Sequence, residues 1–263
     1  MNIKSILKSK MISLADKLET QPKRYGDNSI VTLFHNIDDS GSQYSVSPVE
    51  FTKIIDYLVD TRTETEWCSA QFLGDTDRRK LSERSICITF DDALQSAYVP
   101  IVQMMERNCK CTLFVISNYP DDRSSKIMTW NQIKHLDSLN VEIGSHTLSH
   151  PHLPNISNNE LRKELYDSKA KIEDVLGKQV NTIAYPYGEF DRRVIDFARE
   201  AGYTSGFTTQ HIYAYDEYRP YIIPRFEPRS KIELEGLVQG RSHLFYKTLD
   251  YYFSAKNKLI SLQ

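Results

Sequence analysis

The residues best suited to chemistry in this 263-residue chain are histidines and a pair of neighbouring carboxylates. Three of the seven histidines, His146, His150 and His152, lie within the stretch SHTLSHPHL. His146 and His150 are four residues apart, and on one helical turn this spacing would place both imidazoles on one face, ready to share a cation. Pro151 disfavours the α conformation for His150, so we expect the turn to end there. His152 is then expected to be a rim or structural residue.

The neighbouring carboxylates are Asp91 and Asp92, which follow the apolar run SICITF. In an extended chain their side chains point to opposite sides, so one can bind a metal while the other faces a metal-bound water. The alternative is a helix N-cap followed by a first-turn acid that the helix dipole stabilises. One aspartate and two histidines make a three-ligand set with open positions, which is typical of a catalytic zinc centre and also tolerates cobalt or manganese.

The elements that must position these residues follow from the hydrophobic pattern. Apolar runs of strand length alternate with amphipathic helical stretches, which predicts parallel strands joined by crossover helices. About seven such units in roughly 220 residues favour an α/β fold built as a closed or nearly closed (β/α) barrel, with an open doubly wound sheet as the alternative. The expected strands are 29–35, 85–90, 111–116, 141–145, 182–185, 204–209 and 221–224, and the expected helices are 48–60, 92–107, 130–139, 158–176 and 191–201.

In such a barrel the chemistry lies at the C-terminal ends of the strands. Residues suited to binding or catalysis lie at the end of five of the expected strands or just after it, namely His35, Asp91-Asp92, Ser145-His146, Pro186-Tyr187-Gly188 and Arg225. Residues far apart in the sequence are therefore expected to meet on one rim. For two of them a plainer interpretation stays open: His35 as a buried strand-end histidine, and Arg225 as half of a structural ion pair.

Composition excludes some classes of function. The 33 basic and 35 acidic residues give a net charge of −2, which offers no indication of a nucleic-acid partner. The four cysteines include no second CxC or CxxC to complete a metal site, and they favour a reduced compartment over a disulfide framework.

The two ends of the chain differ from the expected barrel domain at 26–240. Residues 1–25 are predicted to form an amphipathic basic helix, and residues 241–263 a basic, Tyr-rich one. Lysines interrupt the first segment, so it is predicted to be neither a signal peptide nor a membrane span. The expected location is cytoplasmic, with peripheral contact to the inner membrane face as a hypothesis for the basic helices. Packing on the barrel or on a partner subunit is the alternative, and the oligomeric state is not predicted.

Three segments carry a resemblance to a known family. ITFDDA, SHTLSHPHL and AYPYGEFD resemble, in this order, the first three motifs of the polysaccharide deacetylases, carbohydrate esterase family 4, within a similarity spanning about 30–238. FHNI, MTWNQI and IPRFEP are similar to the subgroup found with bacterial surface-polysaccharide synthesis. The resemblance implies a distorted (β/α)7-type barrel, which can be incomplete. It also implies a hydrolase that removes N-acetyl groups from an amino-sugar-containing glycan or glycoconjugate and releases acetate.

The resemblance implies roles for individual residues as well. Asp91 matches the catalytic base, and Tyr187 matches the residue whose backbone N–H donates to the oxyanion, next to Pro186 in the acetyl site. Trp130 of MTWNQI is expected to line the sugar site. The family's divalent metal, most often zinc, is bound by residues that match Asp92, His146 and His150.

The chain also departs from the family pattern. The commoner third motif has an arginine two residues before the proline, where this chain has Ala184, and the usual fourth and fifth motifs are not evident. We expect Arg225 to orient Asp91 in place of that arginine, and His35 to act as the general acid. Two alternatives stay open: a non-catalytic sugar-binding relict of the same fold, and a metal-dependent amidohydrolase that acts on a non-sugar amide.

Overall fold

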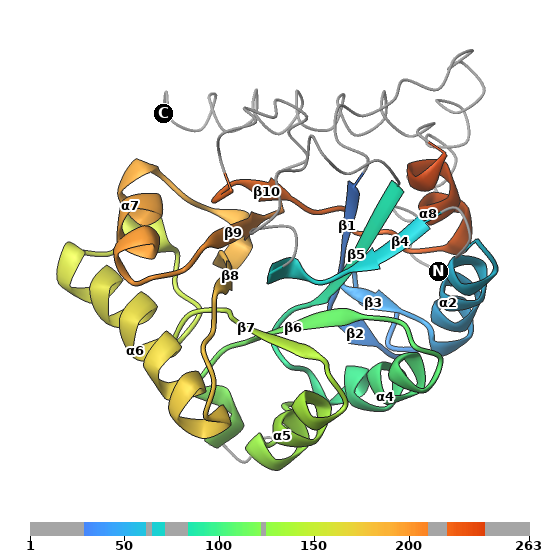
Figure 1. Cartoon of the computed structure of the whole chain (residues 1–263), viewed down its shortest axis with the longest axis horizontal. Helices are drawn as coiled ribbons and strands as arrows, with labels where there is room; N and C mark the ends of the chain where they lie inside the picture. The colour runs from blue at the N-terminus through green and yellow to red at the C-terminus, as the bar shows by residue number, and fades with distance from the viewer. Residues whose placement is uncertain (1–28, 62–64, 72–83, 122–124, 210–219, 240–263) are drawn as a thin grey trace.

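A computed structural model describes residues 29–61, 65–71, 84–121, 125–209 and 220–239. The helices predicted at 1–25 and 241–263 lie outside these residues. Within them, parallel strands follow one another in the order β1-β5-β6-β7-β8-β9-β10, joined by outer helices (Figure 1). These strands are β1 (Ser29–Phe34), β5 (Arg84–Phe90), β6 (Cys111–Val115), β7 (Glu142–Ser145), β8 (Thr182–Ala184), β9 (Ser205–Thr208) and β10 (Ile223–Pro224).

The two ends of this path nearly meet. Phe226, two residues after β10, pairs with Thr32 of β1 through an isolated parallel bridge. Its carbonyl accepts a hydrogen bond from Leu33 N at 2.7 Å, and its N–H donates to Val31 O at 2.8 Å. The predicted α/β fold, a distorted (β/α)7 barrel, is therefore confirmed in preference to the open sheet.

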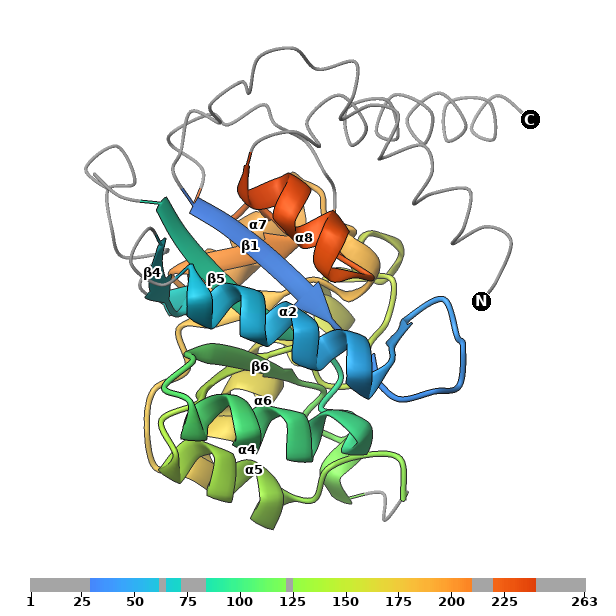
Figure 2. The ribbon, with the colours of Figure 1, turned by 90° about the vertical axis from the view of Figure 1, so that its right-hand side faces the viewer.

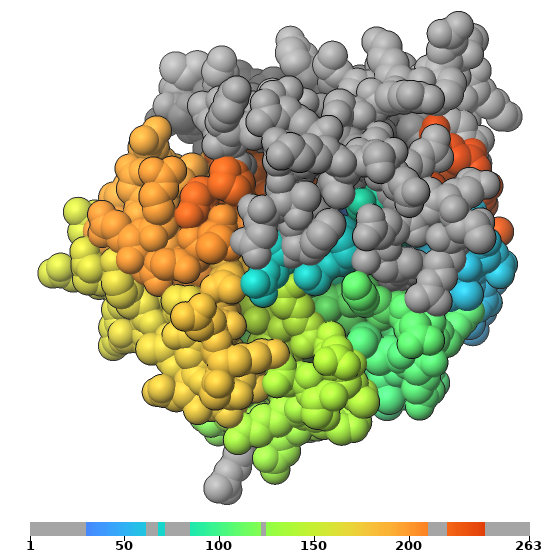
Figure 3. All heavy atoms as spheres, viewed as in Figure 1, coloured from blue at the N-terminus to red at the C-terminus, as the bar shows by residue number. Residues whose placement is uncertain are grey.

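The helices cover the outside of the strands, as two views at right angles show (Figures 1 and 2). They are α2 (Pro48–Asp60), α4 (Tyr98–Glu106), α5 (Trp130–Ser138), α6 (Asn158–Leu176), α7 (Arg192–Glu200) and α8 (Lys231–Val238). Side chains of α5, α6 and α7 form a continuous stretch of the surface (Figure 3). Within the described residues, no helix combines the length and the apolar composition that a bilayer span requires.

Local capping explains why several predicted helix bounds are confirmed. Ser47 caps α2 by accepting from Glu50 N at 3.2 Å, and Gly177 ends α6 in the left-handed conformation. Thr129 caps α5 within a capping box that includes Gln132. The helix predicted at 92–107 is wrong at its start, because the chain makes a turn and the short helix η2 (Gln95–Ala97) before α4 begins.

Some short elements were not predicted. β4 (Thr65–Cys68) pairs with the first half of β5, while β6 pairs with its second half. β2 (Asn36–Ile37) and β3 (Ser45–Val46) form a separate two-stranded sheet on the loop between β1 and α2. Such short runs carry too few residues for a hydrophobic period to be visible.

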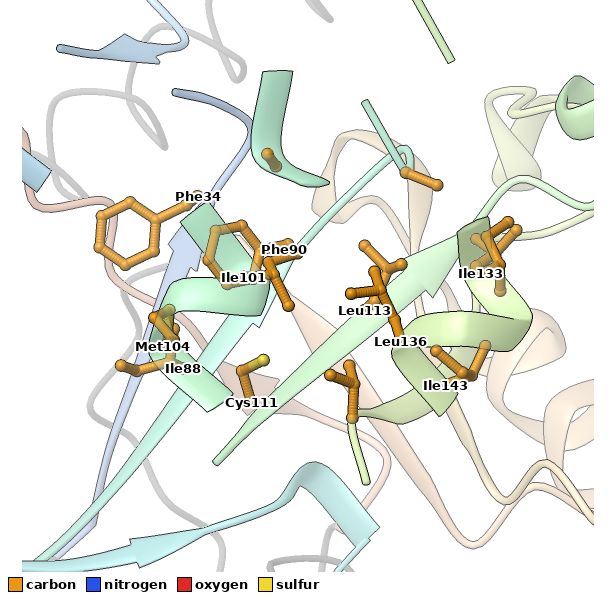
Figure 4. Packing of buried hydrophobic residues seen from close by; sticks show 14 of the residues in the cluster. Phe34, Ile88, Phe90, Ile101, Met104, Cys111, Leu113, Ile133, Leu136 and Ile143 are labelled. Atoms are coloured by element: carbon orange, nitrogen blue, oxygen red, sulfur yellow. The ribbon is translucent and has the colours of Figure 1, made fainter. Parts of the chain in front are cut away.

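The core has two layers, one on each face of the strands. The larger cluster packs between the strands and the outer helices, where Phe90, Ile101, Leu113 and Leu136 interlock (Figure 4). The smaller cluster fills the barrel interior and consists of Val31, Cys68, Ala70, Cys87, Phe114, Ala184, Phe207 and Ile223. Both faces of the strands are buried, so their apolar residues do not alternate with solvated ones, and polar strand residues such as Thr32, Thr89 and Thr112 are buried as well.

A half-buried carboxylate lies at the opposite end of the barrel from Asp91, His146 and Arg225. Both carboxylate oxygens of Glu142, the first residue of β7, accept from Gln71 N, at 3.1 and 3.0 Å. Thr182 Oγ1 donates to Glu142 Oε1 at 3.0 Å and Thr112 Oγ1 to Oε2 at 3.3 Å. Glu142 therefore links β6, β7 and β8 to the residues that follow β4.

Glu142 predicts a pH dependence of stability. Burial raises the pKa of Glu142 above its usual value, although the hydrogen bonds from Gln71, Thr182 and Thr112 oppose this. An acid whose pKa is raised on folding stabilises the fold fully below its unfolded pKa of about 4.3 and loses that contribution as the pH rises through the folded pKa. The free energies of unfolding of wild type and Glu142→Gln should be measured in urea between pH 4 and 8. As the pH rises, the wild type should become less stable relative to the variant. A difference that stays constant with pH would contradict this.

Candidate metal centre

The predicted site residues lie where the parallel strands end. Asp91 and Asp92 follow β5, His146 follows β7, and η5 (Pro186–Gly188) begins two residues after β8. Arg225 directly follows β10. Because β5, β7, β8 and β10 all run in the same direction, these residues come to one end of the barrel.

Asp92, His146 and His150 form a cluster whose ligand atoms all lie within 4.8 Å of one another. Asp92 Oδ1 is 3.4 Å from His146 Nε2 and 3.7 Å from His150 Nε2. This oxygen is buried and has no hydrogen-bond partner among the described residues. A buried carboxylate oxygen without a donor, facing two imidazole nitrogens, fits a divalent cation, because a cation would satisfy all three atoms.

The protonation states of the histidines also fit ligation. His146 Nδ1 lies 2.7 Å from the Ala184 carbonyl, which can only accept, so Nδ1 carries the proton and the Nε2 lone pair faces Asp92. Burial, together with the neighbouring His146, lowers the pKa of His150 to about 4. Its imidazole is therefore neutral at pH 7 and can donate a lone pair to a metal.

The backbone that presents the triad differs from the prediction. The φ angles of Thr147 and His150 are 67° and 64°, so the two histidines stand on a bend and the predicted single helical turn is wrong. Asp92 and Ala93 also adopt left-handed angles, at 68° and 54°, which explains why no helix begins at Asp92. The i,i+4 spacing still brings the imidazoles together, with ring centroids 4.7 Å apart.

Asp91 points to a different partner. Arg225 binds it with two hydrogen bonds, Nη1 to Oδ1 at 2.6 Å and Nη2 to Oδ2 at 2.7 Å, and both side chains are buried. Burial alone would raise the pKa of Asp91, but the charge of Arg225 outweighs it, with a smaller effect of His146, and the pKa falls to about 2. Asp91 Oδ2 lies 3.7 Å from His146 Nε2. An ionised carboxylate therefore stands beside the triad.

His35 directly follows β1. The charge of His35 lowers the pKa of Asp91 less than the charges of Arg225 and His146 do. Within the described residues, no hydrogen bond joins His35 to Asp91. Glu227 Oε1 faces His35 Nδ1 at 3.6 Å, and the Tyr44 ring centroid is 5.3 Å from that of His35. His35 therefore lies close enough to Asp91 to affect its charge, and its role as general acid stays a prediction.

Tyr187 projects from the site, with 53% of its surface exposed. Its ring meets His150 edge-on, with centroids 4.6 Å apart, and stacks on His152 at 4.0 Å. His152 Nδ1 in turn lies 2.8 Å from Glu189 Oε2. His152 therefore lies on the rim, where it holds the Tyr187 ring, and Pro186 beside Tyr187 is buried.

Trp130 stands further away from this centre. It is the first residue of α5 and packs, half-buried, against the larger core cluster. No contact between Trp130 and the triad is recorded among the described residues, so its role in sugar binding stays a prediction.

Three glutamates near the site were missed from the sequence. Glu164 accepts hydrogen bonds from the bend that carries His150, Glu189 pairs with His152, and Glu227 faces His35. Glu227 could have been predicted from the sequence, because it stands two residues after Arg225 and so close to the end of an expected strand. Glu164 was not, because a glutamate in a helix such as α6 is usually solvated.

Comparisons with known proteins find similar sequences in one family. The family model for polysaccharide deacetylases matches residues 78–206. YxkH of Bacillus subtilis, which is named as a polysaccharide deacetylase, is 27% identical over 181 residues, covering 68% of this chain and 64% of that protein. The peptidoglycan-N-acetylmuramic acid deacetylase PdaA of Bacillus subtilis is 26% identical over 141 residues, 52% of this chain and 49% of its own length. The chain thus spans less than two thirds of the length of either relative.

Solved structures show the same fold. The deacetylase PplD of Streptococcus pyogenes, in complex with acetate, superposes with a TM-score of 0.70 at 21% identity, covering 78% of this chain and 96% of that one. IcaB from Ammonifex degensii has a TM-score of 0.70 at 22% identity and covers 81% of this chain and 97% of its own. At such identities the likeness is one of fold, and the candidate site is argued from its own residues.

Proposed function

Because the chain belongs to the polysaccharide deacetylase family, we propose that it is a metal-dependent hydrolase that removes N-acetyl groups from an amino-sugar-containing glycan or glycoconjugate. One observation carries this proposal: the carboxylate of Asp92 and two imidazoles converge on one point, with the ionised Asp91 beside it. The products would be acetate and a free amino group on the sugar.

Asp92, His146 and His150 would hold the cation. Bound there, a divalent metal supplies a Lewis acid that activates water and polarises the amide carbonyl. The nitrogen and oxygen donors suit zinc best, and cobalt or manganese are the alternatives.

The chain's own groups would move the protons. Asp91 is ionised at neutral pH, so it can accept a proton from the attacking water, and Arg225 holds its carboxylate in one orientation. Tyr187 has a left-handed φ of 59°, and its backbone N–H is the proposed donor to the oxyanion. The leaving amine then needs a proton, which His35 or the newly protonated Asp91 would give.

The rim of the site supports a sugar as the substrate. Tyr187 is an exposed ring beside the triad, and Tyr44 is 47% exposed beside His35. Exposed aromatic faces suit the C–H face of a pyranose, which supports a sugar over a small apolar amide. A bacterial surface polysaccharide or its precursor remains our proposed source of that sugar, on the strength of the FHNI, MTWNQI and IPRFEP segments.

Loss of the metal is expected to abolish the reaction. Acetate release should be screened with and without chelator on N-acetylated sugars that are free, nucleotide-linked and lipid-linked, because the carrier is not fixed by the site. Activity should disappear with chelator and return with zinc, cobalt or manganese. Changing Asp92, His146 or His150 to alanine should each lower metal content, measured by elemental analysis, because each removes one of three ligands.

The results separate the proposal from its rivals. Full metal occupancy in all three variants would contradict the assigned ligands. Metal binding without acetate release from any of these sugars would favour the sugar-binding relict. Release from a non-sugar amide alone would favour the amidohydrolase.

A further inference from the structure

We propose that Glu164 is a positioning residue that holds the bend between the two histidines, residues 147–150, in its cation-binding conformation. The inference rests on the metal centre of the proposed function. Glu164 lies in α6, and its hydrogen bonds within the described residues go to Leu148 and Ser149, so it would act through the backbone that presents His150.

Within the described residues, every hydrogen bond of the Glu164 carboxylate goes to this bend. Oε2 accepts from Leu148 N and from Ser149 N, both at 2.9 Å. Oε1 accepts from Ser149 Oγ at 2.6 Å. A carboxylate that accepts from successive backbone N–H groups fixes the peptide planes between them, and bonds to a charged acceptor are the stronger kind.

The bend needs such a restraint because its conformation is unfavourable in isolation. Thr147 and His150, on either side of Leu148 and Ser149, have φ angles of 67° and 64°. Left-handed angles are uncommon for residues other than glycine, and for a β-branched threonine they are outliers that the surroundings must enforce. Within the bend, Thr147 Oγ1 accepts from His150 N at 3.0 Å. Glu164 supplies the restraint from outside.

The two histidines depend on this bend to different degrees. His146 directly follows β7, is buried, and is held at Nδ1 by the Ala184 carbonyl. His150 stands at the far end of the bend and is half-buried. Release of Leu148 and Ser149 should therefore displace His150 and leave His146 in place.

Glu160 offers a matched control on the same helix. One turn earlier in α6, Glu160 Oε2 accepts from Ser157 N at 2.9 Å and from Ser157 Oγ at 2.7 Å. Like Glu164, it binds a backbone N–H and a serine hydroxyl, but it caps the helix and does not touch the bend. Glutamine also serves at this position of a capping box, so Glu160→Gln should leave both the helix and the metal site in place.

The test is zinc affinity, measured by competition with a chromophoric chelator, in wild type, Glu164→Gln and Glu160→Gln. The neutral amide replaces the charge-assisted bonds of the carboxylate with weaker ones and has to donate at its nitrogen end, where Oε1 accepts from Ser149 Oγ. We therefore expect Glu164→Gln to weaken zinc binding by about 10-fold, the lower end of the usual cost of losing a group that orients a ligand. Glu160→Gln should stay within about twofold of wild type. The cobalt spectrum of Glu164→Gln should also change, since His150 moves in the coordination sphere.

Several results would overturn the inference. Wild-type zinc affinity and an unchanged cobalt spectrum in Glu164→Gln would do so, and so would an equal loss of affinity in Glu160→Gln. If Glu164→Gln does not fold, Ser149→Ala decides, because it removes only the bond to Oε1 and should still weaken zinc binding relative to Glu160→Gln. A wild-type chain that binds no zinc, cobalt or manganese would instead contradict the metal centre itself.

Discussion

Asp91→Asn is expected to lose acetate-releasing activity while it keeps its metal. The amide cannot accept the proton of the attacking water, and removing a general base costs about 10²- to 10⁴-fold in kcat. The three proposed ligands remain, because Asp91 is bound by Arg225 and only faces His146 from 3.7 Å. Elemental analysis and an acetate assay on the same preparation would show the two effects separately.

A surface variant controls for the loss of an aspartate–arginine pair. Asp196 pairs with Arg192 in α7, with Nε 3.2 Å from both carboxylate oxygens, and the Arg192 and Asp196 side chains are 83% and 45% exposed. Asp196→Asn should keep both metal and activity. Near wild-type rates in Asp91→Asn would show that another group accepts the proton.

The barrel and the triad were predictable because both follow from patterns that are visible in the amino-acid sequence itself. Strands buried on both faces are apolar runs, and crossover helices between them make the sheet parallel. The C-terminal ends of parallel strands lie on the same rim of a barrel. Asp92 and His146 were therefore expected close together, although 54 positions separate them. Arg225 was predicted as a site residue for the same reason, because it follows a strand, and in the structure it binds Asp91.

The backbone of the site was not predictable in the same way. Asp92, Ala93, Thr147 and His150 all adopt left-handed angles at non-glycine residues. Local preference opposes such angles, so the helix expected from residue 92 and the helical turn expected from His146 were wrong. For the bend that includes Thr147 and His150, the proposed restraint comes from elsewhere in the chain, because Glu164 lies 15 positions beyond Ser149. Only tertiary contacts could reveal them.

Arg225→Met is expected to destabilise the fold strongly. The guanidinium is fully buried against Asp91, with Thr89 Oγ1 3.2 Å from Nη1 and the Phe114 ring 5.3 Å from its centre. Removing it leaves a buried carboxylate without its counter-charge, which typically costs about 3–5 kcal/mol. The orientation of Asp91 is lost at the same time, so activity should fall in any protein that remains folded.

The pH dependence identifies the cause of that loss. The folded pKa of Asp91 is about 2, below its usual value of 3.8, so its contribution to stability is present above pH 3.8 and is lost as the pH falls through 2. Without Arg225, burial dominates and the pKa of Asp91 should rise. The carboxyl then takes up a proton as the pH falls from 7 to 4, and the stability gap between wild type and Arg225→Met should narrow.

Urea unfolding in the presence of a chelator, between pH 4 and 7, would measure that gap. Arg192→Met, which breaks an exposed pair with Asp196, should cost only about 0–1 kcal/mol at every pH. Asp91→Asn combined with Arg225→Met should cost less than the sum of the two single changes, because the double variant leaves neither charge buried alone. Additive costs and a gap that does not change with pH would mean that Arg225 supports the fold by packing, and that its charge does not hold Asp91.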